Sequence, residues 1–156
     1  MTNLSKARAL ALLIPAALLA GAWGSQLIGG LYPCEMCHWQ RWPHYAAVVI
    51  ALLAFVPALP TRLLVTLAAL AIAVSGAIGV AHAGVEYHWW HGFTACTGTM
   101  SSGPITIDDL MKAPIVRCDQ AQWTLFGVSL AGFNAIISLT GAAVILVLLA
   151  RRSRAG

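Results

Sequence analysis

Long apolar stretches separated by short polar segments dominate the chain, and they set the first expectation about its fold. Four such stretches occur, at residues 9–31, 42–59, 63–83 and 125–150. A hydrocarbon core of about 30 Å needs roughly 20 helical residues to cross it, and each stretch is near or above that length. The pattern predicts an all-α membrane protein built as a four-transmembrane-helix bundle.

The first stretch also has features of a secretory signal peptide. Lys6 and Arg8 precede it, and small residues occur near Ala20 and Ala22. Its apolar length exceeds the roughly 7–15 residues of a typical signal core. We therefore expect this stretch to be a membrane span.

The polar connections place two segments on one side of such a bundle. Residues 32–41 and 84–124 lie on that side, and the tight turn at residues 60–62 lies on the other. A loop as long as the second segment is uncommon unless it is functional. Acids at the start of residues 108–112, with apolar neighbours, predict a short helix lying on the membrane surface. We expect a single domain over residues 1–156.

The charges orient the bundle. Only 9% of the residues are charged, against about 25% in soluble domains. Most basic residues fall on the side of the chain ends, and the positive-inside rule makes that side cytoplasmic, with both termini. The basic residues on that side are Lys6, Arg8, Arg62, Arg151, Arg152 and Arg154. All five acids and all four cysteines fall on the opposite side, which in a bacterial inner membrane is the periplasm, where disulfides persist. The basic residues form no patch with interleaved aromatics, so no nucleic-acid partner is expected.

A close pair of cysteines, Cys34-Glu35-Met36-Cys37, lies between the first two stretches. Two intervening residues let the sulfurs meet and part with little strain, which is typical of dithiol redox chemistry. A structural bridge closing so short a loop would constrain little of the unfolded chain. A zinc site usually needs four ligands, which Cys96, Cys118 and several histidines could supply. Redox chemistry is favoured over both alternatives, and no metal is expected.

The same segment also matches Cys-x-x-Cys-His, the attachment motif of c-type haem, through His38. The flanking Pro33 and Arg41-Trp42-Pro43 leave little room for a haem pocket, and a haem gives the second pair of cysteines no role. A haem-carrying electron-transfer subunit remains the alternative to a redox enzyme. A third hypothesis is a non-enzymatic membrane module whose loop is only stapled by disulfides.

The second pair, Cys96 and Cys118, lies in the long polar segment. As a structural bridge it would stabilise the fold by about 3 kcal/mol on the chain-entropy model. Alternatively, the bridge is exchangeable and passes oxidising equivalents from one pair to the other.

Several polar residues near the outer ends of the stretches are candidate ligands for a lipid-soluble acceptor such as a quinone. Arg41 is expensive in an apolar setting, so it either binds such an acceptor, stabilises a thiolate, or reaches a headgroup phosphate. Gln26, Gln40, His44 and His82 are either ligands and proton shuttles or satisfied interfacial side chains. We take Arg41, Cys37, His44 and His82 as the candidate cofactor-binding residues.

Two further features predict how the helices pack. Asn134, in the middle of the last stretch, is expected to hydrogen-bond another helix, and the small residues around Gly76 and Gly79 predict close helix contact.

Three separate motifs resemble one known family. Pro33-Cys34-Glu35-Met36-Cys37 followed by Gln40-Arg41 resembles the Pro-Cys-x-x-Cys-x-x-Gln-Arg signature of DsbB-type disulfide bond formation proteins. Residues 82–86 and 94–98 are similar to the start of that family's second periplasmic loop, and residues 118–119 and 123–134 to its end. The likeness covers nearly the whole chain.

The resemblance implies a membrane oxidoreductase that reoxidises a DsbA-like periplasmic dithiol protein and reduces ubiquinone or menaquinone. Carried over by position, Cys96 is the sulfur that the partner attacks, and Cys118 then attacks Cys34. Cys37 is released beside the quinone, to which it passes electrons. Arg41 matches the family's quinone-site arginine, and His82 lies near a histidine implicated there in some members.

Overall fold

The computed structural model describes residues 2–92, 94 and 116–151. Cys96 and the short helix expected at residues 108–112 lie outside these residues.

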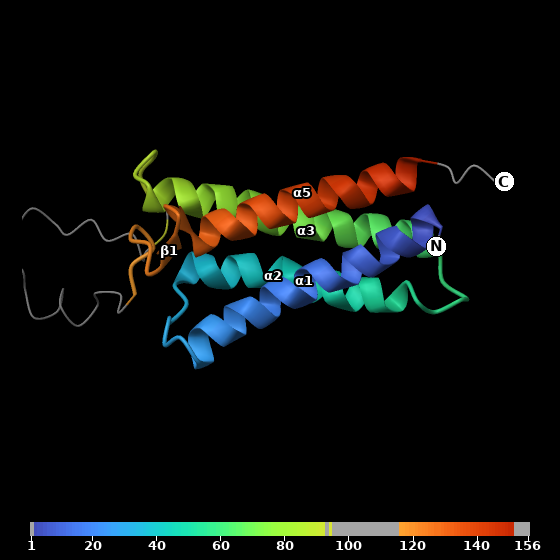
Figure 1. Ribbon diagram of the computed structural model, residues 1–156, viewed down its shortest axis with the longest axis horizontal. Helices are drawn as coiled ribbons and strands as arrows, with labels where there is room; N and C mark the ends of the chain where they lie inside the picture. The colour runs from blue at the N-terminus through green and yellow to red at the C-terminus, as the bar shows by residue number, and fades with distance from the viewer. Residues whose placement is uncertain (1, 93, 95–115, 152–156) are drawn as a thin grey trace, which may run out of the picture.

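Four helices make up the body of the described structure (Figure 1). They are α1 (Asn3–Leu27), α2 (Glu35–Leu53), α3 (Thr61–Glu86) and α5 (Leu130–Ala150). Each helix packs on the next, and α5 returns to pack on α1, so that they form a closed ring. The mostly helical fold predicted from the apolar stretches is confirmed.

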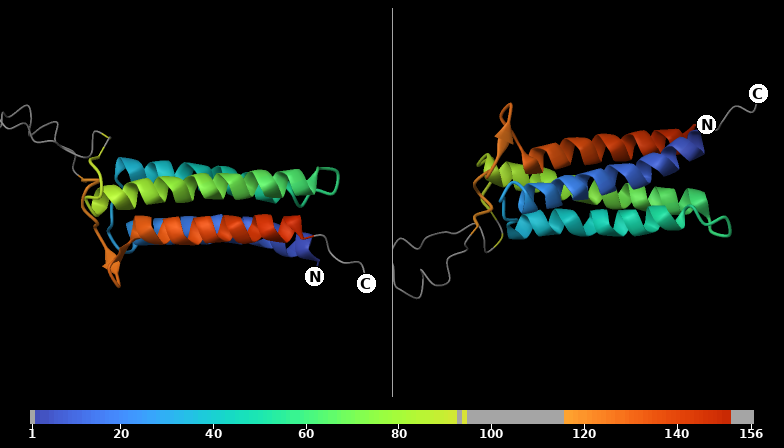
Figure 2. Two further views of the ribbon diagram at one scale, coloured as in Figure 1. Left: turned by 90° about the horizontal axis from the view of Figure 1, so that it is seen from above. Right: turned by 60° about the horizontal axis from the view of Figure 1, so that its bottom comes forward.

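The two ends of the bundle differ (Figures 1 and 2). The start of α1, the turn between α2 and α3, and the end of α5 lie together at one end. The connection from α1 to α2 and a small β-hairpin lie at the other. At the first end, Arg62 at the start of α3 donates a hydrogen bond of 2.6 Å to the carbonyl of Leu149, which shows how close the two helix ends are.

Three of the four helices, α1, α3 and α5, are long and apolar enough to cross a membrane. The helix α2 differs because its first half carries charged and polar side chains, including Gln40, Arg41 and His44. Its 19 residues span about 28 Å at 1.5 Å per residue, which is close to the thickness of a hydrocarbon core. The fourth crossing stays a prediction.

Helix α2 begins earlier in the chain than the apolar stretch at residues 42–59 indicated. Cys34 caps the helix, and residues 35–41 form its first two turns. The helix ends at Leu53, and the residues before Pro57 and Pro60 form turns. Proline lacks the amide hydrogen that a continuing helix needs.

The last apolar stretch, 125–150, begins with a hairpin instead of a helix. Strands β1 (Thr124–Leu125) and β2 (Val128–Ser129) pair antiparallel, and the two residues between them, Phe126 and Gly127, have φ of 51° and 77°. Positive φ at both central positions is the requirement of a tight type I′ turn. Ser129 then ends the hairpin and caps α5 by accepting a hydrogen bond from the Gly132 amide.

Small residues let the helices approach closely, as predicted. The core between the helices is rich in alanine, and a Cβ added at Gly79 on α3 would lie 3.0 Å from the carbonyl oxygen of Ala131 and the amide nitrogen of Ala135 on α5. Such close backbone approach is the main source of packing energy between membrane helices, because lipid is as apolar as the side chains themselves.

Replacing Gly79 by valine should therefore push α3 and α5 apart and lower the free energy of unfolding by roughly 1–3 kcal/mol, the usual range for overpacking. Thermal unfolding of the detergent-solubilised protein measures this. The control is Gly24→Ala on α1, where an added Cβ meets no atom within 4 Å. Equal melting temperatures for Gly79→Val and the parent would contradict the tight contact.

A candidate dithiol site at one end of the bundle

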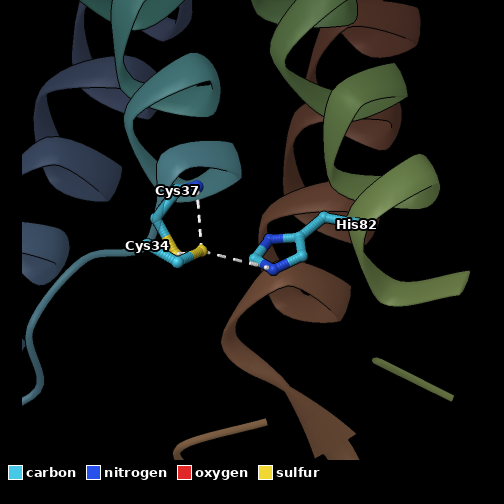
Figure 3. A group of neighbouring side chains, drawn as sticks. All are labelled: Cys34, Cys37 and His82. Carbon is cyan, nitrogen blue, oxygen red and sulfur yellow. Dashed lines mark hydrogen bonds between the residues drawn. The ribbon is translucent and has the colours of Figure 1, made fainter. Parts of the chain in front are cut away.

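The start of α2 holds Cys34 and Cys37 against each other. Cys34 is the N-cap residue, and its sulfur accepts a hydrogen bond of 3.3 Å from the backbone amide of Cys37. The two sulfurs are 2.9 Å apart and both cysteines are free, since a disulfide bond is about 2.05 Å long. The pair is a dithiol in which the sulfurs need only a small movement to bond (Figure 3).

The environment assigns the two thiols different roles. Cys34 is only 4% exposed, and its hydrogen bond to the Cys37 sulfur, together with this burial, raises the pKa of the Cys34 thiol. The proton of a half-ionised pair therefore stays on Cys34 and the charge falls on Cys37. The positive end of the α2 dipole lies at the same place and favours this charge.

His82, on α3, points at the cysteine pair (Figure 3). Its Nε2 lies 3.5 Å from the Cys34 sulfur and 3.6 Å from Oε1 of Glu86, one helical turn further along α3. The side-chain amide of Gln40 donates a hydrogen bond of 2.8 Å to His82 Nδ1. A neutral His82 therefore carries its hydrogen on Nε2 and directs it toward the sulfur and the carboxylate. Glu86 also accepts a short hydrogen bond from the hydroxyl of Ser129.

A buried polar network continues from Gln40 into the bundle. Asn134 on α5 donates to the side-chain oxygen of Gln40 at 2.8 Å and accepts from Nε2 of His44 at 2.9 Å. The Ser75 hydroxyl on α3 donates to the backbone carbonyl of Gln40 at 2.8 Å. The expected link from Asn134 to other helices is confirmed, because it joins α5 to both α2 and α3.

Arg41 is buried, at 7% exposure, with only neutral partners. It donates 2.8 Å and 3.0 Å hydrogen bonds to the side-chain oxygen of Gln26 and the carbonyl of Ala22, both on α1, and its guanidinium lies 5.4 Å from the ring centre of Trp23. No carboxylate forms an ion pair with it within the described residues. A buried cation without a counter-ion strongly favours any anion that comes near it.

One cavity of about 240 Å³ connects these groups. Its walls include apolar side chains of α1 and α5, such as Leu18 and Phe133. Its polar lining gathers every candidate binding residue and both members of the close cysteine pair. These residues are Cys34, Cys37, Arg41, His44 and His82.

The described member of the second pair, Cys118, lies beside the first pair. It is disulfide-bonded and fully buried, in one cluster with Cys34, Met36 and Val85. Its backbone also hydrogen-bonds the His82 ring. The described end of the long polar segment therefore packs beside the dithiol.

Glu86 was not identified as a site residue from the sequence, because it falls within the polar segment at residues 84–124. The signal that reveals it is its spacing of four residues from His82, because residues four apart share one face of a helix.

His38, which completes the haem-like motif, lies away from the dithiol. It is exposed and lines a separate hollow with Trp39 and Trp42, and the histidine that joins the sulfurs is His82. The geometry therefore favours the dithiol interpretation over the haem-carrying alternative.

A membrane helix bundle with a buried dithiol at one end defines a class of protein that makes or exchanges disulfides. Residues 5–148 match the family model described as "Disulfide bond formation protein DsbB", and the chain belongs to this DsbB family. It is similar to the "Disulfide bond formation protein B" of Polaromonas sp. (strain JS666 / ATCC BAA-500), with 32% identity over 147 residues that cover 88% of this chain and 86% of that protein. No solved structure gives a significant match.

The asymmetry of the dithiol predicts which sulfur reacts first. Because the pKa of Cys34 is raised and alkylating reagents attack thiolates, limiting iodoacetamide at neutral pH should label Cys37 before Cys34. Labelling of Cys34 should become comparable only in alkaline buffer. Tandem mass spectrometry of the reduced protein distinguishes the two positions, and equal labelling at neutral pH would contradict the assignment.

Proposed function

We propose that the protein oxidises a DsbA-like periplasmic dithiol protein and passes the two electrons to a membrane quinone, either ubiquinone or menaquinone. The observation that carries this proposal is the shared cavity, because a dithiol and a buried cation, which has no counter-ion among the described residues, open into one space between apolar helices. A water-soluble electron acceptor would not need a cavity between apolar helices, whereas a lipid-soluble acceptor does.

The proposed location is the bacterial inner membrane, with α2 as the fourth span and both termini in the cytoplasm. Arg62, the start of α1 and the end of α5 lie at the end of the bundle opposite the cysteines. The positive-inside rule places that end in the cytoplasm. The dithiol end then faces the periplasm, where disulfide formation takes place.

The proposed exchange moves oxidising equivalents outward. A thiolate of the partner attacks Cys96 of a Cys96–Cys118 disulfide, and Cys118 leaves as a thiolate. Cys118 then attacks Cys34 of an oxidised Cys34–Cys37 pair, and Cys37 leaves as a thiolate. The partner's second thiolate attacks its own sulfur bound to Cys96, the freed Cys96 displaces Cys34 from Cys118, and the partner leaves oxidised. The burial of Cys118 in one cluster with Cys34 supports the second step.

The residues around the cavity fit a quinone head group. The cavity of about 240 Å³ is slightly below the roughly 300–1,000 Å³ of typical ligand pockets, so a ring fits while an isoprenoid tail lies outside it. Arg41 would donate to one ring oxygen. His44 is buried and lines the cavity, and its Nδ1 has no hydrogen-bond partner among the described residues. Because Nε2 carries the hydrogen, Nδ1 would accept a hydrogen bond from a hydroxyl of the reduced quinone.

A bound quinone supplies the acceptor for two electrons and two protons. The chain's residues prepare the sulfurs for it. Arg41 and the start of α2 stabilise the thiolate of Cys37. Cys34 must lose its proton when the disulfide closes again. His82 already carries its hydrogen on Nε2, so the base that would accept this proton is the Glu86 carboxylate, which lies beside His82 and also lines the cavity.

Cysteine substitutions test the relay. Cys37→Ser should reduce quinone reduction to background, because no sulfur then delivers electrons at the cavity. Cys118→Ser should accumulate a covalent complex with the reduced partner through Cys96, which dithiothreitol releases. The readouts are ultraviolet absorbance of the quinone and non-reducing electrophoresis. Quinone reduction that survives in Cys37→Ser would overturn the proposal.

Arg41→Met should raise the quinone KM by about 10- to 100-fold, the range for losing a hydrogen bond from a charged group. Formation of the covalent partner complex should stay unchanged, because that step takes place at Cys96. Arg62→Met, which removes a cation at the opposite end of the bundle, is the matched control. An unchanged quinone KM in Arg41→Met would contradict the role of this arginine.

A further inference from the structure

We propose that the reduced dithiol and His82 together form a binding site for a thiophilic divalent cation such as Zn²⁺ or Cd²⁺. The three ligand atoms would be the sulfurs of Cys34 and Cys37 and Nε2 of His82, which all lie within 4.8 Å of one another (Figure 3). The cation is not a resident cofactor in this scheme. It binds only when the pair is reduced, and the site itself does not depend on the quinone chemistry.

One of the distances between the ligand atoms already matches that of a tetrahedral zinc site, and another needs a small change. Bonds of about 2.3 Å to sulfur and about 2.0 Å to nitrogen place a sulfur and a nitrogen ligand about 3.5 Å apart and two sulfurs about 3.8 Å apart. The Cys34 sulfur and His82 Nε2 are already 3.5 Å apart. The two sulfurs, at 2.9 Å, would have to separate by about 0.9 Å, which a rotation of the half-buried Cys37 side chain provides.

The surroundings provide what a metal site needs beyond its ligands. The Cys37 amide already donates to the Cys34 sulfur, a contact that stabilises a metal-bound thiolate. All three ligands line the cavity, so the fourth position is open to a water molecule, as in zinc sites with three protein ligands. The two thiolates neutralise the dication, so the cation and its three ligands together carry no net charge, while Glu86 lies 3.6 Å from Nε2 of His82.

Binding of the cation changes which atoms of the site carry hydrogen. The two thiols release two protons. The hydrogen of His82 leaves Nε2 and one is taken up at Nδ1, so the ring stays neutral. Gln40, which now donates to Nδ1, must then turn its amide oxygen toward the ring. A carboxylate at this position would accept the Nδ1 hydrogen without such a turn, as in carboxylate–histidine–metal triads.

The occupied site would stop disulfide exchange, because both thiolates are held by the cation and neither attacks another sulfur. This consequence rests on the proposed function. The cation would act only at the reduced stage of the cycle, and a chelator would restore activity.

The test is a Cd²⁺ titration of the reduced full-length chain under anaerobic conditions, followed by the ultraviolet thiolate-to-cadmium charge-transfer band. The wild type is compared with a Cys96→Ser/Cys118→Ser variant, in which Cys34 and Cys37 are the only sulfhydryls. Both should bind one Cd²⁺ per chain, and Zn²⁺ should compete. Binding of the same strength after oxidation of the Cys34–Cys37 pair, or one Cd²⁺ shared between two chains, would overturn the proposal.

Histidine variants in the Cys96→Ser/Cys118→Ser background identify the third ligand. His82→Ala should weaken Cd²⁺ binding at least about tenfold, whereas His38→Ala should leave it unchanged, because His38 adjoins Cys37 in sequence but is exposed and outside the cluster. Gln40→Glu should tighten binding. Unchanged affinity in His82→Ala, or weaker affinity in Gln40→Glu, would contradict ligation through Nε2. Circular dichroism confirms folding of each variant, and quinone reduction by chelator-treated wild type tests the proposed function separately.

Discussion

The position of the dithiol depends on one buried hydrogen bond, from the side-chain amide of Gln40 to Nδ1 of His82. It joins α2 to α3 at the level of the cysteines, and Asn134 extends it to α5. It also fixes the tautomer of the imidazole, which presents its other nitrogen to the Cys34 sulfur. Gln40 and His82 are only 6% and 2% exposed, and a buried polar group that loses its partner is costly, so this bond determines structure and chemistry together.

The bond is possible because the helices approach so closely. Gly79 brings the backbone of α3 against α5, and the hydroxyl of Ser75 reaches the carbonyl of Gln40 on α2. Larger side chains at these positions would separate the polar groups that now reach each other. The packing of small residues and the polar network therefore depend on each other. By contrast, the hydrogen bonds of the Arg41 side chain within the described residues all go to α1, and this residue lines the cavity.

Much of this arrangement was predictable from the sequence. The apolar stretches gave the helices, and the residue types Cys34, Cys37, Arg41, His44 and His82 identified groups that line one cavity. The early start of α2 was not predictable from hydropathy, because its first two turns are polar and one face of them lies against protein instead of lipid. The hairpin at residues 124–129 was missed because its residues are as apolar as the helix that follows. The roles of Cys96 and the surface helix remain predictions.

The capping of α2 by a cysteine has a consequence for the backbone. Helix caps are usually serine, threonine, asparagine or aspartate, whose acceptor oxygens never change their chemistry. In the proposed function Cys34 alternates between a thiol and a half-cystine, and a half-cystine sulfur has less negative charge to offer the Cys37 amide. In that cycle the first turn of α2 would be held more firmly when Cys34 is a thiol than when it is part of a disulfide. Arg41 stands on the second turn of α2, so in the proposed function a change of redox state at the sulfurs would reach the cation that faces the quinone.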